Sequence, residues 1–283
     1  MNMPRNRFLG DMLTTLFDRS GNMRGAVDKR DIFGLCHALL SPEGTVSGYV
    51  LAATVLDRYK SLSPDEKTVF FTFLNEEFDI DADALAALSQ GYAADPSPAA
   101  FEALSQAAEP KRQEFLRRLN QPAGATADIV AMRVDLLNIL KENPELARTN
   151  YDFAHLLRSW FNRGFLVLTA IDWDTPAAIL DKIVAYEAVH QINDWDDLRR
   201  RLKPADRHCF AFFHPAMPNE PLIFVEVALM KAIPNSISDL LSDSRAPLDT
   251  EDARFAVFYS ISNCQKGLTG ISFGNVLIKQ VAA

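Results

Sequence analysis

The chain has 283 residues, of which 48% are hydrophobic and 23% charged, a composition typical of a folded globular protein and unlike that of a disordered one. It holds 29 lysines and arginines against 37 aspartates and glutamates, a net charge of −8. This balance argues against a general affinity for nucleic acid phosphates or anionic membranes.

The cysteines and the absence of long apolar runs indicate the cellular compartment of the protein. Cys36, Cys209 and Cys264 are far apart, and an odd number of cysteines cannot all pair within one chain, which favours a reducing compartment. The opening MNMPRNRFLGDMLTTLF has only a short apolar stretch interrupted by Asp11, so no signal peptide is expected. The sequence contains no run of about 18 uncharged apolar residues, which is the pattern that would predict a membrane span. We therefore expect a cytoplasmic protein.

The length predicts about two domains, and the first half of the chain has the pattern of helices. Apolar residues recur every three or four positions around 50–58, 101–104 and 115–119, as in helices with one buried face. Ser63 and Glu66 have capping-box spacing with Pro64 between them. A helix should begin there and bury one face through Phe70, Phe73, Leu74 and Glu77. Prolines separate these periodic runs, at Pro96, Pro98, Pro110 and Pro122.

Further along the chain the pattern changes from helices to strands. A helix is expected from Asp128 to about Leu140, closed by Asn143 and Pro144. After Gly164 a short apolar run at 165–168 precedes a long helix, which Thr175 and Pro176 should cap and which should carry on one side Ile179, Ile183, Tyr186 and His190. Strands are expected at 209–213, 222–229 and 255–262.

These patterns predict an α+β protein with two domains. Residues 1–163 should form an all-helical bundle that mediates self-association. Residues 164–283 should form a mixed α/β domain.

The stretch FYSISNCQKGLTGISFGN, residues 258–275, is the most informative part of the sequence for function. A strand leads through Gly267, Gly270 and Gly274 into a helical pattern. Such a turn aims backbone amides at a helix N-terminus, where the dipole favours a phosphate and glycines allow close approach. An ordinary connection between a strand and a helix fits the same spacing. The stretch matches neither the dinucleotide fingerprint nor the nucleotide P-loop.

The same stretch and three preceding blocks resemble malonyl-CoA decarboxylase. The blocks are GFLVLTAIDWDTPAAILDKIVAYEAVH, WDDLRRRLKPADRHCF and FAFFHPAMPNEPLIFVEVAL, and all four follow the family order between residues 164 and 281. RSWFNRGFL at the junction, and more weakly the preceding helices, also look like that family. The resemblance implies a carboxy-lyase that converts malonyl-CoA to acetyl-CoA and CO2 through a thioester enolate, without an organic cofactor.

The resemblance also implies a catalytic domain similar to GNAT acetyltransferases, in which this stretch binds the CoA diphosphate. The CoA-binding residues that it implies are Gln265, Gly267, Leu268, Thr269, Gly270, Ile271, Ser272, Phe273, Gly274 and Asn275.

Two motifs of the family are missing from these 283 residues. The family's catalytic serine lies in a Ser-Leu-Ser-Pro-x-Pro-Gly-Phe-like segment and its histidine in an Asn-Phe-His-like segment, and neither occurs here. No catalytic residue is therefore assigned, and we expect a truncated catalytic domain that by itself releases no CO2. The alternative function is a non-catalytic CoA-binding or oligomerisation protein derived from the family. An acetyltransferase is a weaker third interpretation.

Several histidines and cysteines are candidate reactive groups, but a structural role is expected for each of them. His214, before Pro215, could touch a thioester, but a histidine that orders its loop is the expected role. Cys36 and His37 are adjacent on an apolar helix, a geometry that suits core packing better than a nucleophile pair. Cys264 could have its thiol tuned by a helix N-terminus, but we expect it to fill space in the loop.

The charged runs are also expected to have structural or solvated roles. Arg199, Arg200 and Arg201 are expected on a solvated helix face, with contact to a CoA phosphate as the minority interpretation. Asp172 and Asp174 flank a tryptophan without the spacing of a metal site. No metal is expected.

Overall fold

A computed structural model describes residues 28–42, 44–242 and 245–282, apart from the side chains of 44–47, 275 and 276. These residues form two compact units, which are described separately. Among the described residues, the first unit comprises 28–129 and Asp135–Phe153, and the second comprises Val130–Val134 and 154–282. The domain boundary expected after residue 163 stays a prediction. The opening segment considered for a signal peptide lies outside the described residues, and no described helix is long and apolar enough to cross a membrane.

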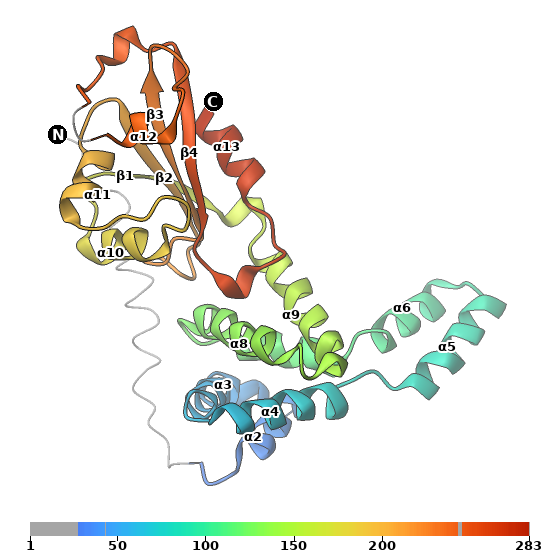
Figure 1. Ribbon diagram of the computed structural model, residues 1–283. Coiled ribbons are helices and arrows are strands. Elements are labelled where there is room, and N and C mark those ends of the chain that lie inside the picture. The colour runs from blue at the N-terminus through green and yellow to red at the C-terminus, as the bar shows by residue number, and fades with distance from the viewer. Residues whose placement is uncertain (1–27, 43, 243–244, 283) are drawn as a thin grey trace. The chain divides into compact units, whose positions relative to one another are not determined.

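The first unit is built from helices joined by short connections (Figure 1). Two further helices, α8 and α9, have residues in both units. The helices up to α9 are α2 (Ile32–Leu40), α3 (Gly44–Lys60), α4 (Pro64–Glu77), α5 (Ala82–Ala94), α6 (Pro98–Ala107), α7 (Lys111–Leu119), α8 (Ala125–Ile139) and α9 (Ala147–Trp160), with a 3₁₀ turn η1 (Pro144–Leu146) before the last.

The capping box at the start of α4 is confirmed. The Ser63 amide donates to Glu66 Oε2 at 2.8 Å, and the Glu66 amide donates to Ser63 Oγ at 3.4 Å. The expected buried face is only partly correct, since Phe71 is fully buried whereas Glu77 is exposed. The reason is tertiary: Phe71 packs edge-on against Phe153 of α9, 6.2 Å between ring centroids.

Helix α8 starts three residues earlier than its apolar spacing predicts, at Ala125. Gly124 precedes it in the left-handed region, at φ 81°, where a residue without Cβ is not strained. Asn143 and Pro144 follow the end of α8, as expected. The chain then turns through η1 and continues as α9.

The second unit is a four-stranded antiparallel sheet with helices (Figure 1). Its strand order follows the sequence, β1-β2-β3-β4, and the α+β class is confirmed. The elements are β1 (Val167–Ile171), α10 (Ala177–Tyr186), α11 (Trp195–Leu202), β2 (Arg207–Phe213), β3 (Ile223–Met230), α12 (Ile237–Leu241), β4 (Phe255–Asn263) and α13 (Gly274–Ala282), with 3₁₀ turns η2 (Arg163–Phe165), η3 (Thr250–Asp252) and η4 (Lys266–Leu268).

Two expectations for α10 are wrong. The helix ends at Tyr186, so His190 lies beyond it. Glu187 ends the helix because its carboxylate accepts hydrogen bonds from the amides of Val189 and His190, both at 2.8 Å. Thr175 does not cap the helix, because its hydroxyl accepts from the Asp172 amide instead.

Glu226 of β3 is a buried carboxylate. Arg201 Nη1 of α11 donates to its Oε2 at 3.2 Å, while its Oε1 has no partner among the described residues. Burial raises the pKa of Glu226 to about 7, although Arg201 opposes the shift. A carboxyl group whose pKa is higher in the folded chain than in the unfolded chain binds more protons when the chain is folded. Its stabilising contribution is therefore complete at pH values below its pKa in the unfolded chain, and it is lost as the pH rises towards 7.

We therefore expect Glu226 to lower the free energy of unfolding by on the order of 3 kcal/mol between pH 4.5 and pH 8. Urea denaturation across this range should show the loss in the native chain and a flatter profile in Glu226→Gln. Glu251→Gln removes an exposed carboxylate and should keep the native profile. An unchanged pH dependence in Glu226→Gln would show that this carboxyl does not titrate there.

Candidate functional site

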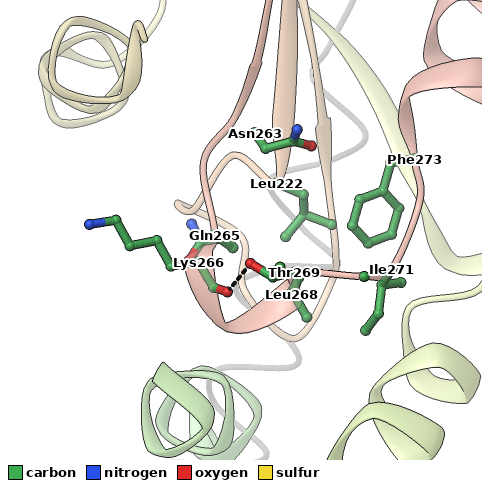
Figure 2. Close-up of a pocket in the computed structure, with 9 residues that line it drawn as sticks. Leu222, Asn263, Gln265, Lys266, Leu268, Thr269, Ile271 and Phe273 are labelled. Atoms are coloured by element: carbon green, nitrogen blue, oxygen red, sulfur yellow. Dashed lines mark hydrogen bonds between the residues drawn. The ribbon is translucent and has the colours of Figure 1, made fainter. Parts of the chain in front are cut away.

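The connection between β4 and α13, residues 264–273, is called the glycine loop here. It makes a tight 3₁₀ turn in which the amides of Leu268 and Thr269 donate to the carbonyls three residues earlier, those of Gln265 and Lys266, at 3.0 and 3.1 Å. The Thr269 hydroxyl donates to the Lys266 carbonyl at 2.6 Å (Figure 2). Gly270 then takes φ 83°, which residues with a Cβ rarely adopt. The chain thereby turns and enters α13 at Gly274.

The glycine loop borders a hollow of about 240 Å³. Six of the ten residues implied for CoA binding line it: Gln265, Leu268, Thr269, Gly270, Ile271 and Phe273. Gly267, Ser272 and Gly274 do not line it, and the side chain of Asn275 lies outside the described part of the structure. Three lining residues were not expected: Leu222, Asn263 and Lys266 (Figure 2).

The sequence signals that could have predicted these lining residues differ in strength. Lys266 adds a positive charge to the loop that the sequence predicts as a phosphate cradle, so its charge is a signal that sequence reasoning could use. Leu222 belongs to the turn between β2 and β3. It reaches the hollow only because its carbonyl accepts from the Cys264 amide at 3.0 Å, a contact that no local pattern predicts.

The backbone of the glycine loop offers donors to an anion. The amides of Gly270, Ser272 and Phe273 donate to no acceptor in the described part of the chain. The first amides of α13 also lack a partner within the helix, because α-helical hydrogen bonds begin with a later residue. Helix N-termini and such adjacent amides attract oxyanions. Of the nine lining residues, Lys266 alone has a titratable side chain. The lining therefore suits anchoring of a phosphate more than proton transfer.

Packing within the protein leaves no room for a side chain at position 267. An added Cβ would lie 2.1 Å from the carbonyl oxygen of Val130 on α8. From the next turn of α8, Arg133 Nη1 donates to the Gly267 carbonyl at 2.7 Å. The sequence placed Gly267 against CoA, whereas the structure places it against α8. This contact holds the turn in place.

The end of β4 is fixed by buried hydroxyls and amides. Ser260 Oγ donates to the Glu187 carboxylate, with oxygen distances of 2.8 and 2.7 Å, and the Ala188 amide donates to Ser262 Oγ at 3.3 Å. The Gln265 side chain donates to the Pro221 carbonyl at 3.0 Å. The glycine loop thus starts from a strand end whose polar groups are paired.

The histidines and cysteines that were candidate reactive groups have structural roles. Trp160 O lies 3.1 Å from His214 Nε2, and the Ala216 amide donates to His214 Nδ1 at 3.1 Å, so this histidine orders its loop. Burial lowers the pKa of its imidazole. Cys264 is buried, and burial raises the pKa of its thiol. The thiol is therefore not activated.

Cys36 and His37 on α2 also have structural roles. Burial raises the pKa of the Cys36 thiol. The ring of His37 stands edge-on to Phe73 and Phe78, with centroids 5.4 and 5.3 Å away.

The arginine run on α11 is not uniformly solvated. Arg199 and Arg200 have side chains 50% and 46% exposed, as expected, but Arg201 is 5% exposed. The expectation is wrong for Arg201 because its guanidinium turns inward to Glu226 and to the carbonyls of His190 and Gln191. No group of three metal-ligating side chains occurs within the described ranges.

Comparison with known proteins identifies the family of this fold and loop. The family model described as malonyl-CoA decarboxylase C-terminal domain matches residues 164–283, and that described as malonyl-CoA decarboxylase N-terminal domain matches residues 78–161. The chain is 38% identical to the mitochondrial malonyl-CoA decarboxylase of Anser anser anser over 179 residues, 61% of this chain and 35% of the relative. It is 35% identical to that of Mus musculus over 189 residues, 64% and 38% of the two chains.

Solved structures agree with these matches. The malonyl-CoA decarboxylase of Agrobacterium vitis is 53% identical with a TM-score of 0.86, and that of Rhodopseudomonas palustris is 52% identical with a TM-score of 0.83. Each comparison covers 89% of this chain and 61% of the solved one. The chain thus spans over a third of the curated relatives and about three fifths of the solved chains. Both domain models, the curated relatives and the solved structures show that this chain belongs to the malonyl-CoA decarboxylase family.

Proposed function

We propose that this protein acts on malonyl-CoA as part of a carboxy-lyase that releases CO2 and leaves acetyl-CoA, with the glycine loop binding the CoA diphosphate. The observation that carries the proposal is the hollow beside this loop, where the amides of Gly270, Ser272 and Phe273 have no acceptor among the residues that the structure describes. Family membership supplies the substrate class. The proposed CoA-binding set is the one expected from the sequence with Lys266 added, and within it Gly267 acts through the packing of the turn on α8 and not by lining the hollow.

The chemistry explains why anchoring matters. Loss of CO2 from a malonyl thioester leaves an enolate, and the thioester itself accepts the electron pair. Donors aimed at the thioester oxygen would lower the barrier, and a proton must then reach the α-carbon. Binding energy from the remote CoA moiety can orient the malonyl group for these steps. We assign the glycine loop to this anchoring and no described residue to proton transfer.

A pair of glycine substitutions tests the loop assignment. Gly270 and Gly124 both have φ near 80°, at 83° and 81°, and neither would bring an added Cβ within 4 Å of another atom. Gly270→Val and Gly124→Val should therefore suffer similar backbone strain, of order 1–2 kcal/mol. Only Gly270→Val should place a side chain where the diphosphate approaches.

Calorimetric titration with CoA should show binding to the native chain and to Gly124→Val, and a loss of at least about tenfold in Gly270→Val, equivalent to 1.4 kcal/mol. Equal affinity in the two variants would contradict the assignment of the loop. In an assay with malonyl-CoA, CO2 release by the native chain would exclude the alternative of a non-catalytic CoA-binding protein.

We also propose that the helical domain, residues 1–163, mediates homo-oligomerisation. The hairpin of α5 and α6 supports this proposal, because neither helix has a buried residue. Its apolar side chains include Phe101, which is 59% exposed and lies 6.2 Å from the ring of Tyr92. Exposed apolar surface of this kind is typical of interaction sites.

Phe101→Glu should therefore shift the native chain towards the monomer in light scattering at micromolar concentration, by placing a charge in an apolar contact. Val69→Glu is the control, since Val69 is 56% exposed on α4. A native chain that is already monomeric, or equal effects of the two variants, would contradict a contact through the hairpin.

We infer a cytoplasmic location from the cysteines. Cys36, Cys209 and Cys264 are all unpaired and buried, which fits a reducing compartment.

A further inference from the structure

The hollow beside the glycine loop has one charged side chain in its lining, that of Lys266. The other lining residues carry no titratable group, so no carboxylate of the lining opposes this positive charge. The side chain of Lys266 is exposed. Its ammonium makes no hydrogen bond and no ion pair within the described part of the chain. The charge is thus accessible to an anion that enters the hollow.

The ammonium of Lys266 and the amides that have no acceptor among the described residues lie on different sides of the turn. Those amides belong to Gly270, Ser272 and Phe273. Figure 2 shows the side chain of Lys266 pointing away from Phe273. The backbone of Lys266 is fixed, because its carbonyl accepts from the amide and from the hydroxyl of Thr269, at 3.1 and 2.6 Å. An anion bound at the amides therefore leaves the ammonium free to contact a second anionic group.

CoA carries two separate anionic groups that match this arrangement. Its diphosphate joins the pantetheine arm to the 5′ carbon of the ribose, and a further phosphate is attached to the 3′ carbon of the same ribose. Backbone amides beside a helix N-terminus suit the diphosphate. The 3′-phosphate is a monoester with about two negative charges at neutral pH. Because the whole chain has a net charge of −8, this group needs a local cation, and lysine binds phosphate as a point charge.

We propose that Lys266 binds the 3′-phosphate of CoA and makes the site select CoA over analogues that lack this phosphate. The inference rests on the proposed anchoring of the diphosphate at the glycine loop. It gives Lys266 a role in specificity, which is separate from the anchoring by the loop amides. The acyl group and the pantetheine arm do not enter this selection, because only the ribose end of the ligand differs.

Calorimetric titrations of the full chain with CoA and with dephospho-CoA, which lacks only the 3′-phosphate, measure the selection. The native chain should bind CoA about tenfold tighter than dephospho-CoA, as expected for one charged hydrogen bond. Lys266→Gln removes the charge at an exposed position, so the fold should stay intact, which thermal unfolding checks. This variant should bind CoA about tenfold more weakly than the native chain does and should keep the native affinity for dephospho-CoA.

Lys279→Gln is the matched control. Lys279 is exposed in the last turn of α13 and does not line the hollow. The substitution removes the same charge from the same unit of the protein, and solvent and salt screen an exposed charge that does not touch the ligand. This variant should therefore bind CoA and dephospho-CoA as the native chain does.

The titrations separate the failure of this inference from the failure of the anchoring proposal. Equal affinity of the native chain for the two ligands would overturn the role of Lys266 and leave the anchoring proposal intact. An equal loss of affinity for both ligands in Lys266→Gln would also overturn it, since the ammonium would then contact the diphosphate. The same holds if Lys279→Gln and Lys266→Gln weaken CoA binding equally. A native chain that binds neither ligand would contradict the anchoring proposal and, with it, this inference.

Discussion

Replacing Gly267 by alanine should destabilise the second unit by about 3 kcal/mol or more, beyond the usual cost of one added methyl group in a packed core. The added Cβ would lie 2.1 Å from Val130 O and 2.8 Å from Val130 Cγ1. The oxygen belongs to the backbone of α8 and cannot rotate away. The turn must therefore move, which would also strain the hydrogen bond from Arg133 to the Gly267 carbonyl. Urea denaturation monitored by circular dichroism measures the loss.

Gly91→Ala is the control for this substitution. Gly91 lies inside α5, and an added Cβ would have nothing within 4 Å. Alanine is the better helix former, so this variant should be stabilised by up to about 1 kcal/mol. The two variants thus make the same chemical change with opposite expected signs. A Gly267→Ala chain as stable as the native one would show that the turn has room to shift.

Replacing Arg112 by methionine should destabilise the first unit by about 3–5 kcal/mol, the usual cost of leaving a buried charge without its partner. Arg112 is 3% exposed and pairs through Nε with Asp152, which is 2% exposed, and through Nη2 with Asp79 at 3.0 Å. Without the guanidinium, Asp152 keeps the amide of Gln113, 2.6 Å away, but no positive charge. Methionine fills a similar volume, so the loss reports on charge more than on a cavity.

The matched control is Arg117→Met on the same helix, α7. Arg117 is 37% exposed and pairs with Glu109 and Glu114. Surface pairs of this kind contribute at most about 1 kcal/mol. Thermal unfolding of both variants should therefore separate a large effect from a small one. Equal shifts of the two melting temperatures would contradict the importance of the buried pair.

Much of the local structure could be predicted from the sequence because it depends on residues close together in the chain. The capping box of Ser63 and Glu66 spans three residues, and its hydrogen bonds form within one helical turn. The three strands expected in the second half occur as β2, β3 and β4 within two residues of the expected ends. Alternation and turn residues carry that information locally.

Some features of the candidate site could also be predicted from local sequence, whereas others could not. The change from strand to glycine turn to helix was readable from Gly267, Gly270 and the apolar pattern after Gly274. Gly270 indeed takes the left-handed conformation that favours glycine. The reason for Gly267 was not readable, because the residues that need it, on α8, are about 134 positions away in the chain. A glycine required by a distant helix and a glycine required by a ligand look alike in one sequence.

Charge burial shows why tertiary structure was needed. Arg199, Arg200 and Arg201 are identical in the sequence and adjacent in α11, yet only Arg201 turns inward, to Glu226 of β3. The sequence by itself determined the helical and strand segments, the caps, the glycine turn and the family resemblance, all of which rest on local spacing or on blocks of consecutive residues. The tertiary structure decided which charges are buried and what Gly267 contacts, because those depend on which distant elements pack together.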